Sequence, residues 1–161
     1  MKKLLIVGAI ILGSIGFSTS ALAAISEQQA KDIVKKEAPN GQITKFKLDK
    51  ENGRMVYEIE VMDGNIEKDY EIDAETGAIL KMEHEQKGNK NAGSVNNPKI
   101  SYDKAKEIAL KQSKNGKFKE IELKHKNGVL VYEVEIAEGF MDRKFLIDAN
   151  TGKILRDKKD F

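Results

Sequence analysis

The side chains best placed to do chemistry in this 161-residue chain are carboxylates at alternate positions of two neighbouring segments. Glu58 and Glu60 lie in the stretch VYEIEV, and Glu67 and Asp69 lie in the stretch IEKDYEID. Alternation puts these four side chains, named here the carboxylate face, on one side of a pair of β-strands. If Asp63-Gly64 is a two-residue turn, Glu60 is expected opposite Glu67, and Glu58 opposite Asp69.

Like charges directly opposite each other destabilise a sheet, so the cost of the carboxylate face suggests a use. Three interpretations remain open. The face is a solvated, solubilising surface, a contact for a basic partner such as the other half of the chain, or a set of oxygen ligands for a calcium ion. In the second half, the corresponding pairs are Glu135 with Asp142 and Glu133 with Lys144, which removes half of the repulsion.

Nucleophilic and metal chemistry find little support in the sequence. The chain has no Cys, and Ser26 and Ser101 are better explained as helix N-caps than as nucleophiles. His84 and His125 are both expected in solvent. Glu83-His84-Glu85 offers metal ligands, but three adjacent side chains in a flexible segment make a poor cage. We therefore expect no enzyme activity, no bound metal and no cofactor.

The elements that must position these residues occur twice. The stretch Val56–Val61 returns as VYEVEI at Val131–Ile136, and the offset of 75 positions holds without a gap from Ile25 to Lys81. Over these 57 paired positions, 23 residues are identical. A repeat unit of this length contains several elements, so we expect two domains and not a solenoid array.

Each copy is expected to begin with a helix capped by Ser26 or Ser101, and Gln29 completes a capping box in the first copy. The helices should end near Pro39-Asn40-Gly41 and near Asn115-Gly116. Alternating residues then predict strands joined by tight turns, Asn52-Gly53 among them. The fold class is therefore α+β, with two tandem repeats. Each repeat has one N-terminal helix packed on a three- to four-stranded antiparallel meander, with Tyr57 and Tyr132 in the core.

Residues 1–23 are typical of a signal peptide, because Lys2 and Lys3 precede an apolar run and Ala21-Leu22-Ala23 resembles a cleavage site. The run is shorter than the roughly 20 residues of a membrane span. A retained N-terminal anchor is the alternative. We expect secretion or residence in the cell envelope, without stable membrane insertion after cleavage. The expected parts are a signal peptide (1–23), module 1 (24–82), a flexible linker (83–99), module 2 (100–157) and a tail (158–161).

Charge argues against a nucleic-acid partner. Without Lys2 and Lys3, 26 basic side chains balance 26 acidic ones, so there is no general attraction for phosphates. The halves differ, however. Residues 25–81 carry 13 acidic and 9 basic groups, whereas residues 100–156 carry 9 acidic and 12 basic groups.

The order of motifs in both copies resembles the PepSY family, named after peptidase propeptides and a spore-cortex regulatory protein. The residues that carry the resemblance are Gly53, Val56, Tyr57, Glu58, Glu60, Asp73, Ala74, Thr76, Gly77, Ile79 and Leu80, with the same types 75 positions later. The resemblance implies a helix packed on a small antiparallel sheet. It also implies that the chain restrains or guides a secreted peptidase, which here would be a separate protein.

Two functions are therefore expected as alternatives. In the first, the chain is an exported, non-catalytic binding module that regulates, inhibits or chaperones a secreted peptidase in trans by strand addition at an open sheet edge. In the second, it is an envelope-associated structural or adaptor module that binds wall polymers or membrane proteins. The basic side chains that favour the second function are Lys114, Lys117, Lys119, Lys124 and Lys126. Oligomeric state and docking between the modules stay open.

Overall fold

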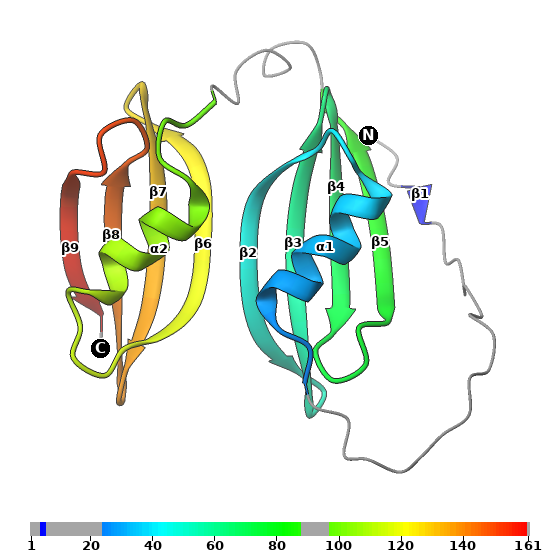
Figure 1. Ribbon diagram of the computed structural model, residues 1–161, viewed down its shortest axis with the longest axis horizontal. Helices are drawn as coiled ribbons and strands as arrows, with labels where there is room; N and C mark the ends of the chain where they lie inside the picture. Colours follow the sequence, from blue (N-terminus) through cyan, green and yellow to red (C-terminus); the bar gives the residue numbers. More distant parts are fainter. Residues whose placement is uncertain (1–3, 6–23, 88–96, 161) are drawn as a thin grey trace.

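The computed structural model describes residues 4–5, 24–87 and 97–160. Most of the predicted signal peptide therefore lies outside the described residues. The α+β class is confirmed, with two helices on an antiparallel sheet (Figure 1). The elements are β1 (Leu4–Leu5), α1 (Glu27–Glu37), β2 (Gln42–Glu51), β3 (Arg54–Asp63), β4 (Ile66–Asp73), β5 (Ile79–Gln86), α2 (Tyr102–Leu110), β6 (Lys117–Lys126), β7 (Val129–Glu138), β8 (Met141–Asp148) and β9 (Ile154–Asp160).

All described strands belong to one sheet in the order β1-β5-β4-β3-β2-β6-β7-β8-β9. Module 1 contributes α1 and β2–β5, and module 2 contributes α2 and β6–β9. The modules meet where β2 pairs with β6 in antiparallel fashion. Both helices lie on the same side of the sheet (Figure 1). Among the described residues, no helix lies over the opposite side of the sheet, called here the outer face.

Hydroxyl caps begin both helices, as the sequence predicts. The Oγ of Ser26 accepts a hydrogen bond from the Gln29 backbone N–H at 3.3 Å, and the Gln29 side chain accepts one from the Ser26 N–H at 2.8 Å. Ser101 Oγ accepts from the Lys104 N–H at 3.2 Å. Each cap satisfies backbone donors that the first helical turn leaves free. Both serines are therefore used structurally.

The first hairpin turn of each module is also confirmed. Asn52 and Gly53 have φ angles of 48° and 83°, and Asn127 and Gly128 have φ angles of 51° and 78°. Positive φ at both loop residues defines a type I′ turn, which Asn-Gly adopts at low cost. This turn fixes the register of β2 on β3, where Glu51 pairs with Arg54.

The motif residues shared by the two copies hold each helix on its sheet. The Tyr57 hydroxyl donates to the Ile25 carbonyl at 3.0 Å, and the Ile25 N–H donates to the Ala74 carbonyl at 2.7 Å. In module 2, Tyr132 donates to Ile100 at 3.2 Å. Tyr57 and Tyr132 are 6% and 3% exposed. The core assignment of both tyrosines is thus correct, and the family signature is largely architectural.

The D-A-x-T-G turns close the same junction. Asp73 Oδ1 accepts hydrogen bonds from the Thr76 N–H at 2.8 Å and from the Glu75 N–H at 3.0 Å. Burial opposes ionisation of Asp73, but the hydrogen bonds from Thr76 and Glu75 outweigh it and lower the pKa of its carboxyl. Asp148 makes the corresponding bond to the Thr151 N–H at 2.8 Å.

The predicted register of β3 on β4 is wrong by two residues. The loop residues are Gly64 and Asn65, because Asp63 pairs with Ile66. Gly64 has φ +64°, which suits the first loop position of a type II′ turn and explains the shift. Glu60 therefore faces Asp69, and Glu58 faces Glu71. In module 2, the same shift pairs Glu135 with Lys144, Glu133 with Leu146 and Ala137 with Asp142.

Three boundaries differ from the sequence expectation. Residues 83–86 of the predicted linker lie in β5, paired with β4, so His84 belongs to a strand and not to a tether. Residues 158–160 of the predicted tail lie in β9. Helix α2 ends at Leu110, several residues before Asn115-Gly116. Both final strands are longer than expected because charged residues continue the pairing beyond the apolar stretch.

Candidate functional site

The carboxylate face lies on the outer face of β3 and β4, and lysines of the same module neutralise most of it. Glu58 Oε1 lies 3.2 Å from Lys47 Nζ, and Glu60 Oε1 lies 3.5 Å from Lys45 Nζ. Glu67 Oε1 lies 2.7 Å from Lys87 Nζ. These counter-charges come from module 1 itself, and a contact between the carboxylate face and a basic partner stays a prediction.

The fourth member of this face, Asp69, lies in a row of carboxylates that crosses three strands. It pairs directly with Glu60 on β3 and with Glu83 on β5. Burial raises the pKa of Glu60, the nearby Asp69 and Glu67 raise it further, and Lys45 opposes them. The Glu60 carboxylate is thus costlier to ionise in the folded chain than in water.

A metal centre does not form among the described residues, where no group of three His, Asp or Glu side chains is arranged to hold an ion. The Glu83-His84-Glu85 triplet illustrates the reason. All three residues lie in β5, whose successive side chains point to opposite faces of the sheet. Glu83 and Glu85 lie on the outer face, and His84 lies on the helix side. The calcium interpretation gains no support from this geometry.

The β5 edge is the side of module 1 that lies farthest from the seam with module 2 in the sheet order. Leu4 and Leu5 pair with it in antiparallel fashion, opposite His84 and Glu83. The Lys87 N–H donates to the Asn65 carbonyl at 2.9 Å, so by antiparallel alternation the N–H of His84 points away from β4. The β5 edge therefore accepts an additional antiparallel strand.

The opposite end of the sheet is a charged edge. Strand β9 carries a run of charges from Arg156 to Asp160. Arg143 of β8 holds this strand through Asp157, with Nε–Oδ1 and Nη2–Oδ2 distances of 2.7 and 2.6 Å, and it also pairs with Glu138 at 3.1 Å. A continuous row of charges disfavours pairing with an incoming strand. The two ends of the sheet thus differ in their readiness to bind.

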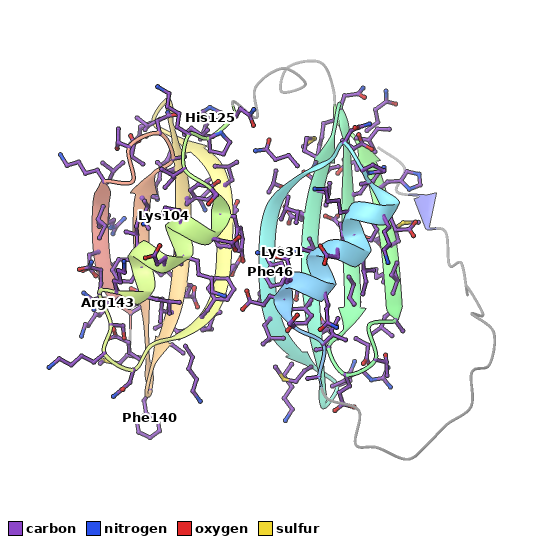
Figure 2. All side chains as sticks on the ribbon, in the orientation of Figure 1. Lys31, Phe46, Lys104, His125, Phe140 and Arg143 are labelled. Carbon is purple, nitrogen blue, oxygen red and sulfur yellow. The ribbon has the colours of Figure 1, made fainter. Side chains whose placement is uncertain are left out.

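The seam between the modules is a second site, which the sequence analysis did not locate. Phe46 of β2 faces Ile121 of β6 and packs with its ring centroid 5.9 Å from that of Tyr102. Lys31 Nζ lies 4.0 Å from the Tyr102 ring centroid and 2.8 Å from Asp103 Oδ1. Lys31 and Phe46 both lie on the side of module 1 that faces module 2 (Figure 2).

Most of the module 2 lysines that suggested polymer binding form ion pairs with carboxylates of the same module. Lys119 pairs with Asp142 at 2.6 Å, and it also contacts Glu135. Lys124 lies 2.6 Å from Glu122, and Lys126 lies 3.6 Å from Glu133. These contacts reduce the charge available to an anionic polymer. The Phe140 side chain, by contrast, is fully exposed at the β7–β8 turn and projects away from the body of the molecule (Figure 2).

Helices offer no route across a membrane in the described residues, since neither α1 nor α2 has the length and apolar character that a spanning segment needs.

Comparison with known proteins gives a consistent relationship over most of the chain. The family model for the peptidase propeptide and YpeB domain, PepSY, matches residues 24–83 and 99–158. The chain is 30% identical over 144 residues to the Uncharacterized protein YkoJ of Bacillus subtilis, covering 89% of this chain and 79% of YkoJ. The crystal structure of a predicted lipoprotein from Clostridium difficile superposes with a TM-score of 0.56 at 24% identity, covering 88% of this chain and 96% of that one.

Proposed function

Because this chain belongs to the PepSY family of peptidase propeptide and YpeB domains, we propose that it is an exported, non-catalytic protein that binds and regulates a secreted peptidase in trans. The family takes its name in part from peptidase propeptides, which are segments that act on a peptidase by contact. The described residues offer a sheet edge for such contact and no arranged metal ligands.

The observation that carries this proposal is the pairing of an extra strand with β5. Leu4 and Leu5 take the place that a partner strand would occupy. If residues 1–23 are removed as a signal peptide, this edge is left without that strand. An extended segment of a peptidase would then bind mainly through backbone hydrogen bonds, which require few special side chains.

Side chains beside the edge favour a particular kind of strand. Glu83 and Glu85 of β5 lie on the outer face next to Asp69 and Glu67. Lys81 and Lys87 contact them, but these four carboxylates outnumber the two lysines, so an added strand gains from lysine or arginine there. On the helix side, Met82 packs against the apolar core and favours an apolar partner. We therefore propose that the bound segment alternates basic and apolar residues, and that Glu67 and Asp69, the members of the carboxylate face on the strand beside β5, contribute to its recognition.

The proposal is tested by titrating residues 24–161 into a secreted metallopeptidase from the same source and following hydrolysis of a large protein substrate. Slowed hydrolysis that saturates at a fixed stoichiometry supports regulation by binding. Co-elution of the two proteins should parallel the slowing. Unchanged hydrolysis together with no complex over the whole titration would contradict the proposal.

The second candidate, an envelope adaptor, is favoured by one observation, the fully exposed Phe140. The corresponding position in module 1 is Asn65. An exposed aromatic side chain at a hairpin tip suits insertion into a pocket of a membrane or wall protein. Replacing Phe140 by Asn should abolish retention on isolated envelopes if this candidate is correct. Retention unchanged by that substitution would remove its basis.

A further inference from the structure

The seam between the modules has a two-fold relationship that the linear repeat does not require. Phe46 and Ile121 are equivalent positions, and they face each other. On either side, Lys45 pairs with Glu122 and Lys47 pairs with Glu120. Exchanging the modules maps the first of these pairs onto the second. The β2–β6 seam is therefore built like the isologous interface of a symmetric dimer, although one chain supplies both halves.

The helix layer follows the same symmetry. Lys31 and Lys106 are equivalent positions, and each reaches the first turn of the opposite helix. Lys106 Nζ lies 2.6 Å from Glu27 Oε1, and Lys31 Nζ lies 4.0 Å from the ring centroid of Tyr102, the residue equivalent to Glu27. Each module thus presents a lysine to an acceptor of the other. Because each module carries both the lysine and an acceptor, this layer would also suit two identical modules.

Charge on the outer face breaks the symmetry. Module 1 places Lys45 and Lys47 where module 2 places Glu120 and Glu122. Pairing β2 with a second β2 would put Lys45 opposite Lys47, and pairing β6 with a second β6 would put Glu120 opposite Glu122. Like charges directly opposite each other destabilise a sheet. Lys45 Nζ instead lies 3.8 Å from Glu120 Oε1 across the seam.

We propose that the lysine edge of β2 is a recognition surface specific for the glutamate edge of β6, and that the external partner it fits is module 2 of a second copy of this chain. The apolar contacts and the helix contacts would form in any pairing of two modules. The charges of Lys45, Lys47, Glu120 and Glu122 favour the pairing of module 1 with module 2 over the pairing of two identical modules. Within one chain, the covalent connection favours the internal pairing by raising its effective concentration. When like charges block the internal pairing in two chains whose seam charges are complementary, module 1 of each chain should pair with module 2 of the other.

The first test is made in the full chain with E120K/E122K. The new side chains would face Glu135 and Glu133 within module 2, so that module should stay folded while its edge repels Lys45 and Lys47. Amide exchange at 45–47 and 120–122 should rise by about tenfold or more, with the other strands still protected. The charge-matched control is E83K/E85K on the distant β5, which should leave exchange at the seam unchanged.

The second test is association in trans. A K45E/K47E chain and the E120K/E122K chain should each be monomeric alone, and an equal mixture should give a 1:1 complex by light scattering. Lys45 and Lys47 also neutralise Glu58 and Glu60. A second form of the first chain therefore carries E58Q and E60Q, in case the double variant does not fold.

The quadruple variant K45E/K47E/E120K/E122K completes the design. It should be monomeric, with exchange at the seam returned to the wild-type rate. Wild-type exchange in E120K/E122K would overturn the proposal, as would folded variants that fail to associate when mixed. Association of either double variant with itself would also overturn it, because charge would then not select the partner.

Discussion

Phe46 of β2 and Ile121 of β6 occupy equivalent positions in the two repeats and face each other at the centre of the strand pair that joins the modules. Phe46 is fully buried and Ile121 is 1% exposed. A domain of about 60 residues buries only about 60% of the surface that its unfolded chain exposes, less than larger domains do, and is marginally stable alone. The seam therefore completes the core of both modules.

Replacing Phe46 by Ala should lower the free energy of unfolding by about 3–5 kcal/mol, since it removes a fully buried ring. The diagnostic effect lies in the other module, where amide exchange in β6 should accelerate although the substitution is in β2. Phe145 is equally buried within module 2 and provides the control, because Phe145→Ala should affect β8 and β9 more than β2. Mass-spectrometric hydrogen exchange measures both. Unchanged β6 protection in Phe46→Ala would contradict a shared core.

Asp73→Asn should show how much the negative charge of Asp73 in the D-A-x-T-G turn contributes to stability. The hydrogen bonds from Thr76 and Glu75 outweigh burial and hold the pKa of Asp73 below its ordinary value of 3.8. A lowered folded-state pKa contributes stability that is present above pH 3.8 and is lost as the pH falls through the folded-state value. We expect Asp73→Asn to cost about 1 kcal/mol at pH 7 and to converge with wild type in acid. Urea unfolding at several pH values tests this, and a pH-independent difference would argue against it.

Glu60→Gln should have the opposite effect on stability at pH 7. Burial and then the carboxylates of Asp69 and Glu67 raise the pKa of Glu60 above 4.5 despite Lys45, so ionisation weakens the folded state as the pH rises through that raised value. The substitution should stabilise the chain at pH 7 and have no effect below pH 4.5. Melting temperatures at pH 7 and pH 4 test this expectation. Destabilisation at pH 7 would mean that the pairing with Lys45 outweighs the repulsion.

Local signals made much of the fold predictable. Ser26 and Ser101 identify helix starts because a cap depends on neighbouring residues alone, and Asn52-Gly53 identifies its turn through positive φ angles. The register at Gly64 was not predictable from composition, because Asp63-Gly64 and Gly64-Asn65 are both plausible loops. A shift of two residues keeps every side chain on its face, so alternation alone does not detect it.

Non-local pairing explains what sequence reasoning missed at the candidate site. The carboxylate face was placed on one side of β3 and β4, but its lysine partners on β2 and at Lys87 depend on how the strands meet. The seam rests on three residue pairs between distant strands. One signal was present in the sequence. Lys45 and Lys47 correspond to Glu120 and Glu122, a reversal of charge at two alternate positions of the same strand.

Proline substitutions at equivalent edge positions test the central claim most directly. His84 of β5 and Lys159 of β9 are related by the repeat, and proline at either removes an N–H that points away from the sheet while sparing the internal pairing. In the peptidase titration, His84→Pro should weaken inhibition by about tenfold or more, and Lys159→Pro should inhibit like wild type. Inhibition by His84→Pro at wild-type strength, with both variants folded by circular dichroism, would contradict binding through the β5 edge.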